Sequence, residues 1–313
     1  MALIPPAEER RKLGSGPSPY FSSVLGLFGG ILAWLSASSV LLSVYLQPLL
    51  PPPGADGTWK PEDIDAAQRA LAAQPYGPLV FVAPHLAFVL VACALAFLSR
   101  VSFVNRLALH PLRVDKLTLI LMGCGMLGVQ GLVVACSGLL GQPSDHLRML
   151  SELVSEPQGG RAVFVALLVS LVPAFCEELF FRGLVQSRLS AIWHPGLAIL
   201  LTSVVFALVH IDAQHIVAVL PIGLFLGWAA WRSGSVWLSM LLHALNNLGA
   251  VLLDRADPPS WSVWLRSPRW PRPVGPPRAA RRCVRSPRRR TPPTRPRSSG
   301  GATPSGTTTS SRR

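Results

Sequence analysis

The sequence contains seven apolar segments separated by short polar stretches, at about residues 20–46, 78–98, 117–140, 161–189, 197–211, 215–231 and 236–253. An α-helix rises about 1.5 Å per residue, so roughly 20 apolar residues are enough to cross a bilayer. The segment at 197–211 is shorter, and we expect it to be tilted or enclosed by the other helices. Only 14% of the residues are charged, whereas soluble domains carry about 25%. The sequence therefore predicts an all-α, polytopic transmembrane helix bundle of about seven spans.

The N-terminal part indicates how the chain enters the membrane. Residues 1–19 are polar and contain the cluster Arg10, Arg11 and Lys12, which predicts an N-terminal segment in the cytoplasm. The first apolar run is longer than the apolar part of a signal peptide, so we expect an uncleaved span. Residues 20–160 then form N-terminal transmembrane helices and loops. We expect an integral protein of the plasma (inner) membrane.

Two adjacent carboxylates, Glu177 and Glu178, lie inside the fourth apolar segment. A charge at mid-membrane costs about 2.5–3.5 kcal/mol on insertion scales, so each needs a partner or a function. Arg182 follows Glu178 at the i,i+4 spacing, with the acid before the base, which favours a structural ion pair. Glu177 is turned by about 100° from its neighbour on a helix. The spacing therefore leaves Glu177 available for chemistry.

Polar residues recur at helical spacing in two later apolar segments. Phe206 and His210 are four residues apart, and so are His243 and Asn247. At about 1.5 Å per residue, Glu177 and His210 both lie roughly 20 Å from the turn that joins their helices. In an antiparallel pair they would face each other at the same depth. His85, which follows Pro84 in the second segment, is interpreted as a hydrogen-bonded histidine near the membrane interface.

The three patterns EExxxR, FxxxH and HxxxN, in this order on successive apolar segments, resemble the CPBP family of intramembrane proteases. This family includes CAAX prenyl proteases and the bacteriocin-processing and lysostaphin-resistance (Abi) proteins. The resemblance covers about residues 160–253, and we take 161–253 as the catalytic helical core. It implies an enzyme, an intramembrane endopeptidase that hydrolyses a peptide bond of a membrane-anchored or membrane-embedded substrate.

The residue types suit peptide hydrolysis within a membrane. Burial shifts a carboxyl group towards acting as a general base at neutral pH, which suits Glu177 for activating water. His210 can hold the same water. His243 and Asn247 share a helix face and can donate hydrogen bonds to the tetrahedral oxyanion, while Phe206 packs beside the site.

A metal-dependent form of this chemistry is equally compatible with the residues. Glu177, His210 and His243 are three N/O ligands for Zn²⁺, with water as the fourth. A zinc-bound water would then be the nucleophile, and Glu178 would become the candidate base. The resemblance implies a metalloprotease, whereas the residues themselves leave both readings open.

Other functions were weighed against the enzyme. The sequence has no HExxH and no GxGD, which argues against a zincin and an aspartyl-type intramembrane protease. A non-catalytic immunity or scaffold protein that binds a membrane partner is the alternative. Intact motifs favour the enzyme over that alternative, and also over polar residues that merely join helices.

Residues 257–313 differ in composition from the rest of the chain. They contain 14 of the 29 Lys and Arg residues of the sequence and many prolines, so they cannot bury a core and are expected to be disordered. Since the seventh span would end outside, this arginine-rich tail conflicts with the positive-inside rule. We hypothesise that the tail is translated out of frame and replaces an eighth span, which resequencing the gene around codon 256 tests. We predict no nucleic-acid binding from it.

Overall fold

The computed structural model describes residues 19–54, 56–99, 101–141 and 143–256, and these residues belong to one compact unit. Within those ranges the chain is helical and contains no strand. The sequence-based expectations for residues 1–18 and 257–313 lie outside the described residues.

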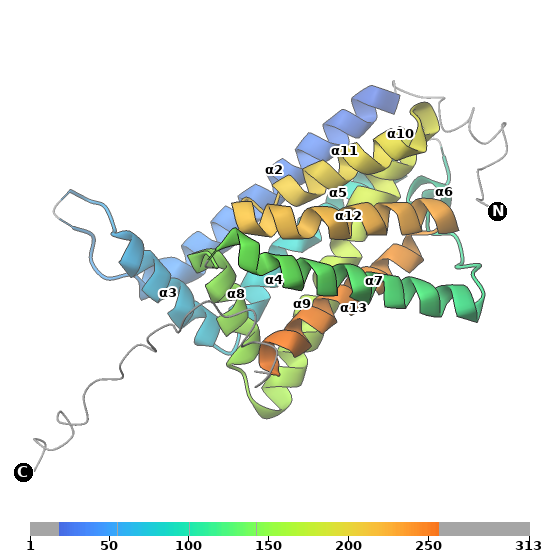
Figure 1. The fold of residues 1–313 in the computed structure, drawn as a ribbon. Helices are drawn as coiled ribbons and strands as arrows, with labels where there is room; N and C mark the ends of the chain where they lie inside the picture. Colours follow the sequence, from blue (N-terminus) through green and yellow to red (C-terminus); the bar gives the residue numbers. More distant parts are fainter. Residues whose placement is uncertain (1–18, 55, 100, 142, 257–313) are drawn as a thin grey trace, which may run out of the picture. The chain divides into compact units, whose positions relative to one another are not determined.

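The first half of the chain forms a series of helices (Figure 1), and one of its apolar segments is interrupted. Their bounds are α2 (Pro19–Leu46), η1 (Gln47–Leu49), α3 (Pro61–Ala73), α4 (Gly77–Val82), η2 (Ala83–His85), α5 (Leu86–Phe97), α6 (Phe103–Arg106), α7 (Lys116–Ser137) and η3 (Gly138–Leu140). The second apolar segment is therefore not one continuous α-helix, because the 3-10 turn η2 separates α4 from α5.

The second half holds the helices that carry the three motifs. Their bounds are α8 (Asp145–Ser155), α9 (Gly159–Glu178), η4 (Leu179–Gln186), α10 (Ser187–Ile192), α11 (Pro195–Leu208), α12 (Ala213–Ser233) and α13 (Val236–Arg255). The segment η4 is a π-helix that continues α9 directly. Helix α9 lies against α13, and α11 lies beside α12 (Figure 1).

Six stretches of the described chain are long and apolar enough to cross a membrane: Ser23–Leu49, Gly77–Phe97, Lys116–Ser137, Gly159–Ile192, Ala213–Ser233 and Val236–Arg255. Helix α11 is apolar but shorter, as expected for the segment at 197–211. The predicted polytopic helix bundle is confirmed, and the protein is an integral membrane protein. The fold differs from the sequence-based expectation at residues 141–160, where α8 occupies part of the expected loop.

Helix positions in the bundle follow from their burial. Only 11% of the apolar windows of α2 and α7 is buried, against 44% in the window at Gly159–Ile192 and 44% in α13. Large apolar side chains such as Phe28 and Leu121 are exposed on the first two helices. Since lipid is the favourable surroundings for such side chains, α2 and α7 face the bilayer while α9 and α13 form the interior.

Local sequence signals set several helix starts. The amide of Thr118 donates to Asp115 Oδ1 at 2.9 Å, and its hydroxyl donates to Oδ2 at 2.7 Å, which caps α7. These hydrogen bonds from Thr118 lower the pKa of the exposed Asp115 carboxyl. Asp212 caps α12 by accepting from the His215 amide at 2.8 Å.

Two hydrogen bonds fix the π-helical segment against α12. Arg182 Nη2 donates to the carbonyl of Gly223 at 3.0 Å, and Gln186 Nε2 donates to that of Gly227 at 2.8 Å. A Cβ atom on Gly227 would lie 2.8 Å from the side-chain oxygen of Gln186. Glycine at this position therefore permits the close approach that brings α12 to the motif-bearing helix.

Candidate active site

The two motif glutamates are the last two residues of α9, immediately before the π-helical segment. Every side chain of η4 is buried, and Glu178 is 0% exposed and Glu177 7% exposed. π-Helical turns are rare, and they occur frequently at functional sites. Both carboxylates thus lie in the interior of the bundle, beside a local departure from regular α-helix.

Glu178 is held by two buried donors on one oxygen. Arg182 Nη1 donates to Glu178 Oε1 at 2.8 Å, so the pair expected from the i,i+4 spacing forms. His243 Nδ1 donates to the same oxygen at 3.0 Å. A buried charge is tolerated when it is paired and hydrogen-bonded. Glu178 therefore anchors α13 to the motif helix, which the spacing alone did not indicate.

Glu177 faces two histidines from different helices. Its Oε1 lies 3.1 Å from His85 Nε2, and its Oε2 lies 3.9 Å from His243 Nε2. The 3.9 Å separation is too long for a direct hydrogen bond and of the size at which a bridging water is considered. One carboxylate oxygen is therefore engaged, while the other faces His243.

Phe206 forms a shared apolar surface beneath the polar residues. Its ring centroid lies 5.3 Å from that of His210 and 5.8 Å from that of His243, with nearly perpendicular ring planes. The guanidinium carbon of Arg182 lies 4.3 Å from the same centroid, a cation–π distance. Phe206 thus contacts members of all three motifs, which accounts for an aromatic residue at this position.

His210 follows α11, and its ring is oriented by the backbone. His210 Nδ1 donates to the Phe206 carbonyl at 2.9 Å, and the ring lies edge-on to His215 at 4.5 Å. In a neutral imidazole this arrangement leaves Nε2 of His210 as a hydrogen-bond acceptor.

Asn247 lies on α13 one turn after His243 and is half-buried. Its side-chain oxygen accepts from Asn246 Nδ2 at 3.3 Å, so its own amide group stays a donor. Asn246 is more deeply buried, and its backbone carbonyl accepts from Gln130 of α7 at 2.8 Å. The printed hydrogen bond of the Asn247 side chain therefore joins it to its neighbour on α13, one turn beyond His243.

His85 makes a contact that the sequence did not indicate. It is hydrogen-bonded, as predicted, through Nδ1 to the Val82 carbonyl, and its Nε2 also contacts Glu177 of the fourth apolar segment. The contact joins residues far apart in the sequence, so no spacing pattern revealed it. The available signal was a histidine after Pro84 within an apolar segment, and a polar residue there needs a partner.

The zinc reading can be compared with the positions of the candidate ligands. Among the described residues, no three His, Cys, Asp or Glu side chains are grouped closely enough to hold a metal ion. The set Glu177, His210 and His243 does not converge as a ligand set in this arrangement, so no step below is routed through a metal.

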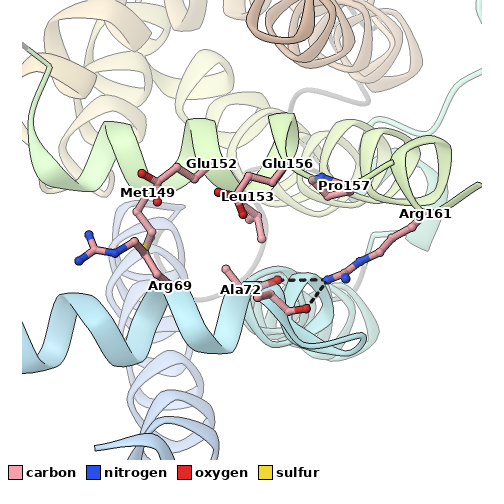
Figure 2. A pocket seen from close by; sticks show the side chains of 9 residues that line it. Arg69, Ala72, Met149, Glu152, Leu153, Glu156, Pro157 and Arg161 are labelled. Atoms are coloured by element: carbon pink, nitrogen blue, oxygen red, sulfur yellow. Dashed lines mark hydrogen bonds between the residues drawn. The ribbon is translucent and has the colours of Figure 1, made fainter. Parts of the chain in front are cut away.

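A separate pocket lies between α3 and α8, at the start of α9. Figure 2 shows the charged side chains of Arg69, Glu152, Glu156 and Arg161 among those that line it. Arg161 Nη2 donates to the carbonyls at the end of α3, the shortest contact being 2.7 Å to Gln74. None of the predicted site residues lines this pocket.

The fold and the cluster together define a polytopic helical membrane protein with a glutamate–histidine site inside the bundle. Residues 159–249 match the family model described as "Type II CAAX prenyl endopeptidase Rce1-like". The chain is also 24% identical over 116 residues to the "Putative membrane peptidase YdiL" of Bacillus subtilis (strain 168), covering 37% of this chain and 45% of that protein. No solved structure matches. Both matches fall on or overlap the region that carries the three motifs, and they support the resemblance to the CPBP family of CAAX-type proteases.

Proposed function

We propose that this protein is an intramembrane endopeptidase that hydrolyses a peptide bond of a membrane-associated protein or peptide. The observation that carries the proposal is Glu177, a buried carboxylate with one oxygen directed towards His243 within a membrane-spanning bundle. A charged group in such surroundings is energetically costly, so its presence there points to a function. The family match over residues 159–249 supports a peptidase.

In the proposed reaction, Glu177 Oε2 takes a proton from a water while the water oxygen bonds to the scissile carbonyl carbon. The resulting oxyanion accepts hydrogen bonds from Asn247 Nδ2 and from His243 Nε2 in its protonated form. Each such donor contributes about 2.7–4 kcal/mol in other hydrolases. The carbon–nitrogen bond then breaks, and Glu177 returns its proton to the leaving amine.

The remaining residues orient this machinery. His243 is directed by its hydrogen bond to Glu178, and Glu178 is held in turn by Arg182. His210 accepts a hydrogen bond from the water through Nε2, because its Nδ1 is committed to the Phe206 carbonyl. Removing Glu178 or Arg182 would therefore act on the reaction through the position of His243.

Cleavage by zinc-bound water is the alternative form of this proposal. It requires Glu177, His210 and His243 to move together, since they are not grouped as metal ligands here. Metal analysis of the purified protein distinguishes the two forms. We expect no stoichiometric zinc, whereas one zinc per chain that is lost in His210→Ala would establish the metal-dependent form.

The proposal is tested by comparing the termini of membrane proteins in cells that carry wild-type protein or Glu177→Gln. This substitution keeps the size of the side chain and removes the base. General-base catalysis contributes about 10²–10⁴-fold, so termini produced by cleavage should fall by at least about 100-fold and thereby identify the substrates. Unchanged termini, together with rescue of a deletion phenotype by Glu177→Gln, would contradict the proposal and favour a membrane-binding immunity or scaffold protein.

A further inference from the structure

The contact between His85 and Glu177 connects the N-terminal helices to the proposed base. His85 ends η2, the 3-10 turn between α4 and α5, whereas Glu177 lies on α9. The family model covers residues 159–249 only, so His85 lies outside the region that the resemblance explains. The Glu177 site is therefore completed by a residue from a different part of the chain.

The hydrogen bonds of His85 restrict where its protons lie. Its Nδ1 donates to the Val82 carbonyl at 2.9 Å, since a carbonyl oxygen can only accept. Its Nε2 lies 3.1 Å from Glu177 Oε1. Both contacts are hydrogen bonds at once only when a proton lies between Nε2 and Oε1. Glu177 Oε1 is then committed to His85, and Oε2 is the oxygen left to take a proton from water.

The backbone around His85 is built to direct this side chain inward. The apolar segment at Gly77–Phe97 is long enough to span a membrane, yet η2 interrupts it at Ala83–His85. Pro84 lies within this turn, and the Leu86 amide donates to the carbonyls of Ala83 and Pro84. The Val82 carbonyl accepts from the ring of His85.

Aromatic side chains hold the ring of His85 in place. Trp34 of α2 lies edge-on to it with centroids 6.2 Å apart, and Phe88 of α5 lies edge-on at 6.5 Å. Trp34 and Phe88 stack on each other at 5.9 Å. The side chain of His85 is only 17% exposed, so two flanking rings and two hydrogen bonds fix its orientation.

We propose that His85 is a positioning residue for the hydrolytic reaction: by holding Glu177 Oε1, it keeps Glu177 Oε2 directed at the water beside His243. The inference rests on the proposed function, because that function makes Glu177 the general base. Its effect is on the chemical step and not on substrate binding, since His85 acts through Glu177 and is not placed in contact with the substrate.

Two substitutions separate a positioning role from simple packing. His85→Gln retains an N–H donor that reaches Glu177 but removes the ring, whereas His85→Phe retains a ring of similar volume and removes both ring nitrogens. The assay uses purified protein in proteoliposomes and a synthetic peptide that spans a Glu177-dependent cleavage site found in the terminal comparison. Thermal unfolding in detergent checks that each variant is folded, and His110→Ala, an exposed loop position, serves as the matched control.

We expect His85→Phe to lower kcat by at least about 30-fold, with KM changed less than 3-fold. His85→Gln should have a kcat much closer to that of the wild-type protein. Full activity of His85→Phe would overturn the inference, because packing would then suffice. Equal loss in both variants would also overturn it, because a hydrogen-bond donor would not be enough. If Glu177→Gln leaves the termini of membrane proteins unchanged, the proposed function itself fails, which is a result distinct from either of these.

Discussion

Glu177 and Glu178 are neighbours in the sequence, but different residues hold their carboxylates. Glu178 accepts from Arg182 and His243 on a single oxygen, whereas Glu177 contacts His85 and faces His243 across 3.9 Å. His243 therefore lies between the two carboxylates: its Nδ1 donates to Glu178, and its Nε2 faces Glu177 across the longer distance. This division gives Glu178 a structural task and leaves one oxygen of Glu177 for a reaction.

Arg182→Met should destabilise the protein strongly. The substitution keeps an apolar stem of similar length but leaves Glu178 buried without its cation, which costs about 3–5 kcal/mol for buried pairs in general. We expect a clearly lower midpoint of thermal unfolding in detergent. The double variant with Glu178→Gln should recover part of the loss, because it also removes the buried charge.

A surface pair provides the control for this experiment. Lys60 Nζ lies 3.8 Å from Glu62 Oε1, and the two side chains are 77% and 75% exposed. Such pairs contribute about 0–1 kcal/mol, so Lys60→Met should change the unfolding midpoint little. An equal shift in Lys60→Met and Arg182→Met would mean that the Glu178–Arg182 pair carries no special stability.

At this scale, the sequence was informative where the contact is local. The Glu178–Arg182 pair follows from helical spacing, because four residues bring two side chains onto one face whatever the rest of the chain does. The His85–Glu177 contact depends on how α4 and η2 pack against α9. Such a contact is set by tertiary structure, so one sequence could indicate only that His85 needed a partner.

The π-helical segment η4 and helix α12 approach closely because α12 offers glycine where η4 offers donors. Arg182 and Gln186 on η4 are spaced by four residues and donate to the carbonyls of Gly223 and Gly227, which have the same spacing on α12. Small residues permit such approach in membranes. The contact determines how far η4, and the glutamates that end α9 just before it, lie from α12.

Gly227→Ala should disrupt this contact. The added Cβ would lie 2.8 Å from Gln186 Oε1 and 3.0 Å from Ile199 Cγ2, so α12 or its neighbours must move. We expect a lower thermal unfolding midpoint and reduced cleavage. Gly128→Ala on α7 is the matched control, because nothing lies within 4 Å of its added Cβ and alanine is favoured over glycine in helices by about 0.5–1 kcal/mol. A loss of stability in Gly128→Ala but not in Gly227→Ala would contradict this account of the contact.

The existence of the spans was predictable, whereas their irregularities were not. Apolar length alone gave the six long segments and the shorter α11, because a bilayer sets the length that a helix needs. The π-helix at Leu179–Gln186 and the 3-10 turn at Ala83–His85 have no such length signal. The 3-10 turn contains Pro84, which removes a backbone donor, and both irregularities lie next to the proposed base.

For the molecule as a whole, the orientation in the membrane is a prediction from charge. We propose a cytoplasmic N-terminus, which places the segment at 143–158 outside and the basic segment at 101–116 inside. Single cysteines at Gln158 and Arg113, introduced after replacing the native cysteines, test this in intact cells. Both positions are exposed. We expect a membrane-impermeant maleimide to label Gln158→Cys directly and Arg113→Cys only after permeabilisation. The reverse pattern would invert the orientation.

The contact between η2 and the end of α9 has a consequence for how such a protein can change over time. The part of the gene that encodes residues 159–249 does not encode every side chain that touches Glu177, since His85 comes from an earlier stretch. A recombination event that replaced only the first spans would preserve all three motifs and still remove a neighbour of the glutamate. The unit that can be exchanged without loss therefore includes both the stretch that encodes His85 and the stretch that encodes residues 159–249. A match to the motif region alone does not show whether a relative keeps the histidine beside this glutamate.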